Sequence, residues 1–155
     1  MSLLAVSAGP VAFALPSAAA PPFDVRTDTG KRLRLEDFQG KVLLLTFWAT
    51  WCPHCRRQIA AMEKLRADYA ANDTEMLVLA VDDEGWQKVT PYLEEHKLSL
   101  PVALASPRIQ QQYAVGGGIP LSYVIDRQGQ LVKDFRGALD EDILRRLGEA
   151  IAKSL

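Results

Sequence analysis

A continuous apolar run, VLLLTFW over residues 42–48, restricts the fold more than any other feature of the sequence. Seven such residues in a row predict a strand that is buried on both faces, as in a parallel sheet with helices on each side. A second run of the same character, EMLVLAV, follows at residues 75–81. Together the two runs predict an α/β fold with a covered central sheet.

Turn residues and hydrophobic periodicity divide the rest of the chain. The turn sequences DTG and DRQG predict hairpins over residues 23–35 and 121–135. Helices are expected over residues 53–73, 85–96, 108–113 and 140–151, with a short strand at 101–104. Strands that alternate with helices predict a mostly parallel sheet, and the closing hairpin makes that sheet mixed.

Three acidic residues, Asp82, Asp83 and Glu84, precede the helix expected at 85–96. The helix dipole favours carboxylates at a helix N-terminus. A metal site is disfavoured because no histidine or further acid lies near them in the sequence. We therefore interpret the three as charges of the first helical turn.

The N-terminal segment, residues 1–22, differs in composition from the rest of the chain. Residues 1–20 carry no charged side chain, and the segment ends in AAAPP, which is typical of the small-residue end of a secretory signal. The positively charged start of such a signal is missing, and Pro10 and Pro16 would break a helix. We expect a signal-like or disordered segment over residues 1–22 and one domain over residues 23–155.

Composition narrows the range of partners. Eighteen Lys+Arg against nineteen Asp+Glu give a formal net charge of -1, so there is no basic excess for nucleic acid or an anionic membrane. Two cysteines rule out a disulfide-rich scaffold and a four-cysteine zinc site. We expect a monomer that uses no nucleic acid, no metal ion and no cofactor.

The two cysteines, Cys52 and Cys55, have C-x-x-C spacing just after the central strand, where Pro53 can begin a helix. The unpaired N–H groups and positive dipole of a helix N-terminus favour a thiolate, the reactive form of cysteine. We expect Cys52 to attack a disulfide and Cys55, one turn further on, to resolve the mixed disulfide. A disulfide across so short a loop would stabilise the fold by only about 2 kcal/mol, which favours redox chemistry over a structural role.

His54 lies between the two cysteines. We expect it, together with Pro53, to tune the thiol pKa and the reduction potential, because a histidine near a thiolate stabilises the reduced form. The alternative is a polar surface residue that fills the turn. His96 is the only other histidine, and the sequence gives it no partner and no role.

The segment FWATWCPHC over residues 47–55 resembles the active site of the thioredoxin fold, W-A-x-W-C-x-x-C. Three further features are similar to the TlpA/ResA branch of that superfamily: a hairpin followed by LEDFQGK at residues 35–41, an extra strand-helix-strand segment around 75–104, and the approach to Ile119-Pro120. The resemblance covers residues 22–152. It implies a thioredoxin fold whose mixed central sheet is flanked by helices, with an N-terminal β-hairpin and an inserted β-α segment.

The resemblance also implies roles for residues outside the cysteine pair. It implies a cis peptide between Ile119 and Pro120 that faces the cysteines. Trp51, Ile119 and Pro120 would then bind substrate, with the Ile119 backbone pairing with an extended segment by strand addition. An ordinary trans proline at the start of a strand is the alternative.

The chain departs from the family pattern at two positions for a buried acid. Many relatives have a glutamate where this chain has Gln58, and thioredoxin has a buried aspartate where this chain has Thr46. A carboxylate there would raise the thiol pKa and accept the proton of the resolving cysteine. Our hypothesis is that Cys52 is more acidic than in relatives with the glutamate, and that Cys55 loses its proton to water.

The leading interpretation is an exported thiol–disulfide oxidoreductase that reduces or exchanges disulfides of proteins through the Cys52-Pro53-His54-Cys55 dithiol. The resemblance implies a periplasmic or otherwise exported protein, free or tethered to a membrane. It also implies protein disulfide or dithiol substrates, a membrane electron donor and a role such as apocytochrome c maturation.

Four alternatives remain open. A disulfide donor like DsbA would share the C-P-H-C motif, although only one helix is expected between Val81 and Pro101, too little for that family's helical insertion. A peroxiredoxin is disfavoured because its P-x-x-x-T-x-x-C pattern does not match residues 46–52. A copper(I) chaperone could use the two thiolates, and a pure interaction module would need neither.

Overall fold

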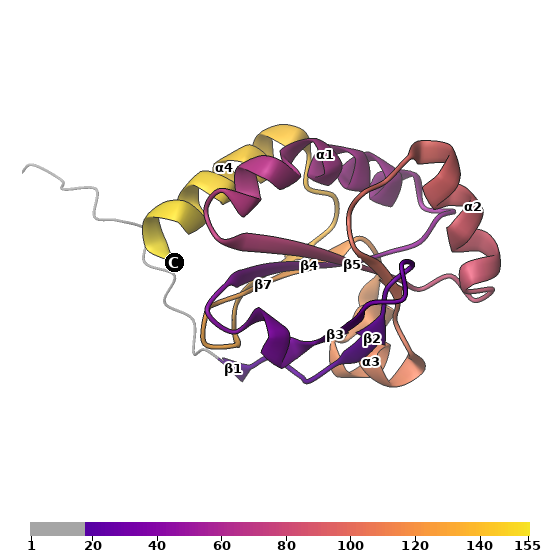
Figure 1. The fold of residues 1–155 in the computed structure, drawn as a ribbon, viewed down its shortest axis with the longest axis horizontal. Helices are drawn as coiled ribbons and strands as arrows, with labels where there is room; N and C mark the ends of the chain where they lie inside the picture. The colour runs from indigo at the N-terminus through magenta and orange to yellow at the C-terminus, as the bar shows by residue number, and fades with distance from the viewer. Residues whose placement is uncertain (1–17) are drawn as a thin grey trace, which may run out of the picture.

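The computed structural model describes residues 18–155 and has a central sheet between two layers of helices and loops (Figure 1). Its strands are β1 (Ala18–Ala19), β2 (Asp24–Arg26), β3 (Arg32–Arg34), β4 (Val42–Trp48), β5 (Thr74–Ala80), β6 (Val102–Leu104), β7 (Leu121–Ile125) and β8 (Gln130–Arg136). Its α-helices are α1 (Pro53–Ala70), α2 (Trp86–His96), α3 (Pro107–Gln112) and α4 (Glu141–Ser154). Two short 3₁₀ helices cover Leu35–Phe38 and Val115–Gly117. Every expected strand and helix is present, with ends shifted by a few residues.

The central sheet has six strands in the order β1-β8-β7-β4-β5-β6, and β2 and β3 form a separate hairpin. β4, β5 and β6 run parallel, whereas β7, β8 and β1 pair antiparallel. This order confirms the mixed central sheet with an N-terminal hairpin. Among the helices of residues 18–155, none is long and apolar enough to cross a membrane.

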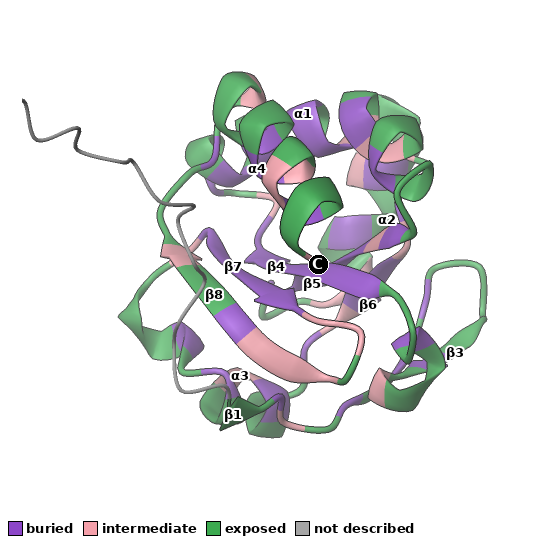
Figure 2. Ribbon diagram, turned by 90° about the vertical axis from the view of Figure 1, so that its left-hand side faces the viewer, coloured by how far each residue is buried: buried purple, intermediate pink, exposed green. Residues whose placement is uncertain are grey.

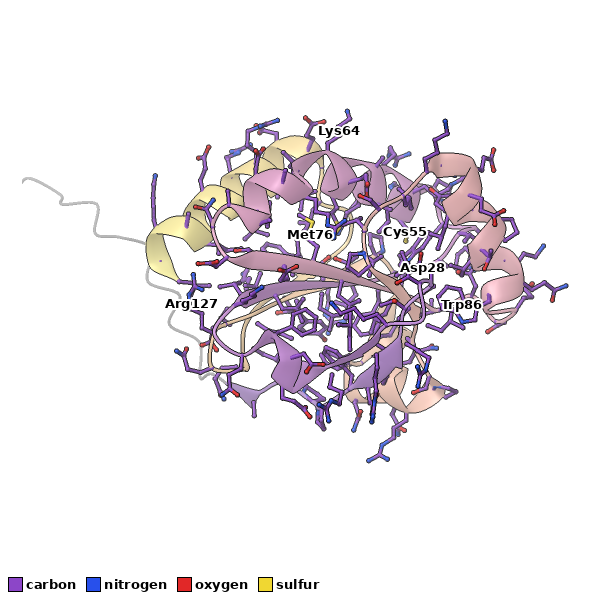
Figure 3. The ribbon with its side chains drawn as sticks, viewed as in Figure 1. Asp28, Cys55, Lys64, Met76, Trp86 and Arg127 are labelled. Carbon is purple, nitrogen blue, oxygen red and sulfur yellow. The ribbon has the colours of Figure 1, made fainter. Side chains whose placement is uncertain are left out.

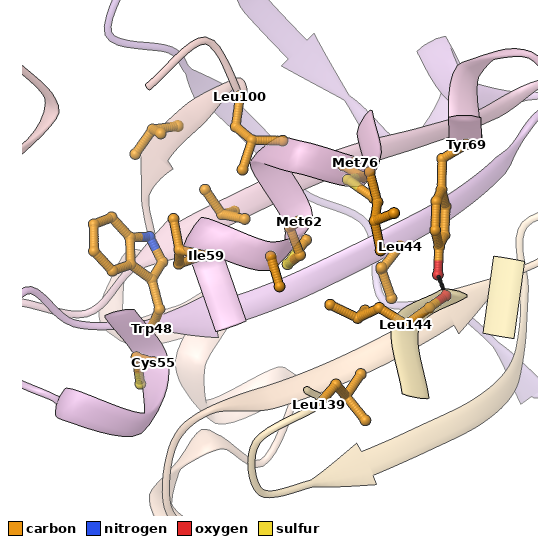
Figure 4. Packing of buried hydrophobic residues seen from close by; sticks show 14 of the residues in the cluster. Leu44, Trp48, Cys55, Ile59, Met62, Tyr69, Met76, Leu100, Leu139 and Leu144 are labelled. Carbon is orange, nitrogen blue, oxygen red and sulfur yellow. Dashed lines mark hydrogen bonds between the residues drawn. The ribbon is translucent and has the colours of Figure 1, made fainter. Parts of the chain in front are cut away.

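β4 lies at the centre of the sheet and is buried on both faces, as its sequence predicts (Figure 2). Leu44 and Trp48 pack on the face covered by α1 and α4, while Leu43 and Phe47 pack on the face covered by the hairpin and α3. Figure 4 shows the first of these clusters, with Trp48 and Cys55 at one end. The central strand therefore connects both halves of the core to the segment that carries the cysteines.

Residues 18–22 take part in the fold, although the sequence analysis grouped them with the N-terminal segment. β1 pairs with β8, Ala20 is buried, and the hydroxyl of Tyr113 donates a 2.6 Å hydrogen bond to the carbonyl of Pro21. A strand of two alanines has no hydrophobic periodicity that could predict it. The signal-like character of residues 1–17 lies outside the described residues and stays a prediction.

Replacement of Tyr69 with phenylalanine should lower the free energy of unfolding by about 1 kcal/mol. The Tyr69 hydroxyl is buried and donates a 2.6 Å hydrogen bond to the Leu144 carbonyl, which joins α1 to α4 (Figure 4). A tyrosine hydroxyl keeps its proton at neutral pH, and burial raises the pKa of Tyr69 further above its ordinary value of about 10. Urea unfolding should give a lower midpoint at the same m-value. An unchanged midpoint would show that this bond adds nothing to stability.

Candidate active site

The two cysteines lie where the central strand β4 passes into helix α1, at the carboxyl end of the parallel strands. Figure 3 labels Cys55 at this end of the molecule. Cys52 is the N-cap of α1, and Pro53 begins the helix, as the sequence predicts. Cys52 is 5% exposed and Cys55 is fully buried. Of the two cysteines, only Cys52 therefore keeps any exposed surface.

The first turn of α1 directs a backbone N–H group at Cys52. The Cys55 N–H donates to Cys52 Sγ at 3.3 Å, so sulfur occupies the place of the usual oxygen of a capping side chain. An anionic sulfur accepts such a bond more strongly than a neutral one, and the helix dipole has the same effect. The local geometry thus favours the thiolate of Cys52 over its thiol.

The loop before β7 brings Ile119 to the cysteine pair. The peptide bond between Ile119 and Pro120 is cis, as expected. Cys52 Sγ lies 4.0 Å from the Ile119 carbonyl oxygen, and Ile119 is half-buried. Trp51 is 66% exposed directly beside Cys52. Pro120 itself is buried. The contact of Trp51, Ile119 and Pro120 with a substrate stays a prediction.

His54 is exposed on the first turn of α1, and Arg57 lies one turn away. Arg57 Nη2 donates to His54 Nδ1 at 2.5 Å, so the site has a permanent positive charge that the sequence analysis did not single out. The tuning role of Pro53 and His54 stays a prediction. His96 stacks on Tyr92 in α2, with ring centroids 4.0 Å apart, and takes no part in the site.

A neutral polar network lies one helical turn beyond Cys55. Gln58 Nε2 donates to Ser122 Oγ at 2.8 Å, and the hydroxyls of Ser122 and Thr46 are 2.9 Å apart. The Leu139 N–H donates to Gln58 Oε1 at 2.8 Å. Thr46, Gln58 and Ser122 are fully buried. The two positions expected for a buried acid thus meet in one network without a carboxylate. Ser122 also belongs to this network, although no pattern in the sequence predicts it.

Asp82 contacts the segment that leads to the cysteines, which corrects its interpretation as a charge of the first helical turn. The helix α2 begins only at Trp86, and its first turn holds no acidic residue. Asp82 is 7% exposed, and its two carboxylate oxygens accept the Thr50 N–H at 3.1 and 3.2 Å. The Thr50 hydroxyl donates to the same carboxylate. Asp83 and Glu84 are exposed.

The fold and the site together define a class of protein: a thioredoxin-fold protein with the helix-capping cysteine pair of a thiol–disulfide oxidoreductase. The sequence profile of the AhpC/TSA family matches residues 16–134. The chain belongs to this family.

Proteins that are similar over most of the chain carry names of the same class. The thioredoxin-like protein YneN of Bacillus subtilis is 34% identical over 71% of this chain and 65% of its own length. The thiol-disulfide oxidoreductase ResA of Bacillus thuringiensis subsp. konkukian is 32% identical over 76% of this chain and 68% of its own length. This chain therefore spans about two thirds of the length of these relatives.

Solved structures agree with the fold. A thiol:disulfide interchange protein of the thioredoxin family from Chlorobium tepidum superimposes with a TM-score of 0.79 at 27% identity, covering 90% of this chain and 99% of its own. StoA of Bacillus subtilis superimposes with a TM-score of 0.73 at 20% identity, covering 86% and 98%, and supports the fold alone. The thioredoxin fold is thereby confirmed.

Proposed function

We propose that this protein is an exported thiol–disulfide oxidoreductase that reduces disulfides of protein substrates through Cys52 and Cys55. The observation that carries the proposal is the pairing of a barely exposed Cys52, bonded by a helix N–H, with a fully buried Cys55 one turn behind it. In this proposal the Cys52 sulfur meets the substrate, and the Cys55 sulfur meets only Cys52. The names of ResA and of the interchange protein from Chlorobium tepidum support the same class of reaction.

The reaction consists of two exchanges of sulfur partners. The Cys52 thiolate attacks one sulfur of the substrate disulfide, the substrate S–S bond breaks, and the departing substrate thiolate takes a proton. Cys55 then loses its proton and attacks Cys52 Sγ, which breaks the mixed disulfide and releases the second substrate thiol. The substrate gains two electrons and two protons, and the protein is left with a Cys52–Cys55 disulfide that an external dithiol must reduce.

The surroundings of Cys52 favour an extended segment of a protein as the substrate. The Ile119 carbonyl oxygen is 4.0 Å from Cys52 Sγ, close enough for a strand paired with the Ile119 backbone to place its own sulfur there. Trp51 offers a large exposed ring beside that strand. We propose that Trp51, Ile119 and Pro120 bind the substrate in this way. For the cell we propose an exported location, free or tethered to a membrane, and a membrane electron donor.

The reduction potential of the Cys52–Cys55 couple against glutathione tests the direction of electron flow. A value below about −220 mV, toward the thioredoxin range, is expected for a reductant. A value near about −120 mV would contradict it and identify a disulfide donor of the DsbA kind. Copper(I) titration of the reduced protein against a competing chelator separates the chaperone alternative, because a reductase has no need for sub-picomolar copper binding.

A further inference from the structure

We propose that Asp82 is a positioning residue that holds the Thr50–Cys52 segment in the conformation that meets a protein substrate. The inference rests on the proposed function for what the segment binds, and on the geometry alone for how the segment is held. The carboxylate accepts both the backbone N–H and the hydroxyl of Thr50. Asp82 itself touches no substrate in this proposal.

The backbone ladder between β4 and β5 ends just before this contact. Its last bond runs from the Val81 N–H to the Trp48 carbonyl at 2.8 Å. Beyond it the two chains separate, one toward the cysteines and the other toward α2. The Asp82 side chain takes over at that point and bonds Thr50 where the next backbone partner is missing. A carboxylate is well suited to this position, because hydrogen bonds to a charged oxygen are stronger than hydrogen bonds between neutral groups.

Asp82 is itself held on the other side by the turn into α2. Its backbone carbonyl accepts the Gly85 N–H at 2.9 Å, and Gly85 is the N-cap of that helix. Gly85 has a φ of +56°, a conformation that residues with a side chain rarely adopt. The backbone of Asp82 is therefore held in place, and its carboxylate can hold Thr50 in place in turn.

The segment that Asp82 holds carries the groups that a client would contact. Trp51 follows Thr50 and is 66% exposed, so its own packing does little to fix it. The Cys52 N–H bonds the Ala49 carbonyl at 3.2 Å, which closes the turn around Trp51. Without the bonds to Asp82, the loop would have to become ordered when the client binds. The loss of conformational entropy would lower the affinity for the client. A small thiol reagent needs only the sulfur and is spared this cost.

The test compares a protein disulfide with a small alkylating reagent in Asp82→Ala, with Asp83→Ala as the matched control. Asp83 is the exposed neighbour of Asp82 and takes no part in the contact. For Asp82→Ala we expect kcat/KM on insulin disulfides to fall about tenfold, mainly through KM, because the lost bonds are those to a buried charge. The rate of Cys52 alkylation by iodoacetamide should change less than about twofold. Equal losses with both substrates would overturn the proposal, as would equal effects of the two variants.

Thr50 provides the second half of the test. Thr50→Val keeps the shape and the backbone N–H but loses the hydroxyl, and should show part of the loss, whereas Thr50→Ser should retain wild-type activity. Thr50→Val should add nothing to Asp82→Ala in the double variant, because both changes remove the same contact. Additive effects would overturn the proposal.

Hydrogen exchange of the Thr50 amide separates this proposal from the proposed function. Exchange should be at least about tenfold faster in Asp82→Ala than in Asp83→Ala, since the carboxylate is the acceptor of that N–H. An unchanged exchange rate of the Thr50 amide in Asp82→Ala would overturn the proposal that Asp82 holds Thr50, whatever the activity of the variant. If the wild-type protein reduced no protein disulfide, the proposed function would fail while the exchange result still decided whether Asp82 holds the loop.

Discussion

Replacement of Cys55 with serine will stop the reaction at a covalent complex between Cys52 and its client. Cys52 is the cysteine that keeps some exposed surface, and its sulfur can still attack a substrate disulfide in this variant. Cys55 is fully buried at the next turn of α1, so its thiolate is the only group placed to break the mixed disulfide from within the protein. Turnover should fall to the background rate, and non-reducing electrophoresis should show a band at the sum of the two masses.

The matched control is Cys52→Ser, which should give neither turnover nor complex. A client can reach Cys55 only through the position of Cys52, because Cys55 has no exposed surface of its own. A complex that persists in Cys52→Ser and disappears in Cys55→Ser would reverse the two roles. Persistence of full cellular activity in Cys52→Ser would instead identify an interaction module.

The features that the sequence predicted are those with a local or periodic origin. The run at residues 42–48 needs apolar surroundings on both faces, and the sheet supplies them. The cysteine pair and Pro53 lie next to one another in the chain, so the start of α1 follows from a few neighbouring residues. The turn sequences likewise fix the two hairpins within a few residues. None of these depends on knowing which distant segments meet.

The features that escaped prediction depend on contacts between distant segments. Asp82 precedes a helix, and local reasoning assigned it to that helix. Its partner Thr50 lies 32 residues earlier in the chain, and only the parallel pairing of β4 with β5 brings them together. Ser122 meets Thr46 through the antiparallel pairing of β4 with β7, and Gln58 reaches Ser122 from helix α1. Asp82 and Ser122 are single polar residues outside any periodic pattern, so the sequence around them does not predict these contacts.

The neutral network beyond Cys55 explains how a glutamine is accommodated at position 58. The amide satisfies both of its ends, donating to Ser122 and accepting from Leu139. A buried amide whose hydrogen bonds are all formed does not destabilise the fold. An amide also neither gains nor loses a proton near neutral pH. We therefore expect Cys55 to release its proton to water or to the departing substrate thiolate. The helix N-terminus, through the Cys55 N–H, favours the thiolate of Cys52, and Arg57 adds a positive charge beside His54 on the same turn of α1.

Replacement of Gln58 with glutamate should therefore change both stability and thiol acidity. The new carboxyl is fully buried, and burial raises its pKa above the ordinary value of about 4.3. At pH 7 the variant should be less stable than wild type by about 2–3 kcal/mol, measured by urea unfolding. To the extent that the carboxylate is ionised, its charge should also move the pH midpoint of Cys52 alkylation upward by about one unit. The wild-type midpoint should lie below the free-thiol value of about 8.5.

The pH dependence of this loss has a definite sign. Well below the unfolded-chain pKa of about 4.3, the carboxyl is protonated in both folded and unfolded chains, and its O–H can donate to Ser122 as the amide does. The variant should there approach wild-type stability. As the pH rises, the unfolded chain ionises first because its pKa is the lower one, and stability falls until the folded-state pKa is passed. Gln58→Met is the control, since it breaks the same network without adding a charge and should show a loss that does not vary with pH. A thiol midpoint that is equal in Gln58→Glu and Gln58→Met would refute the link between this position and the acidity of Cys52.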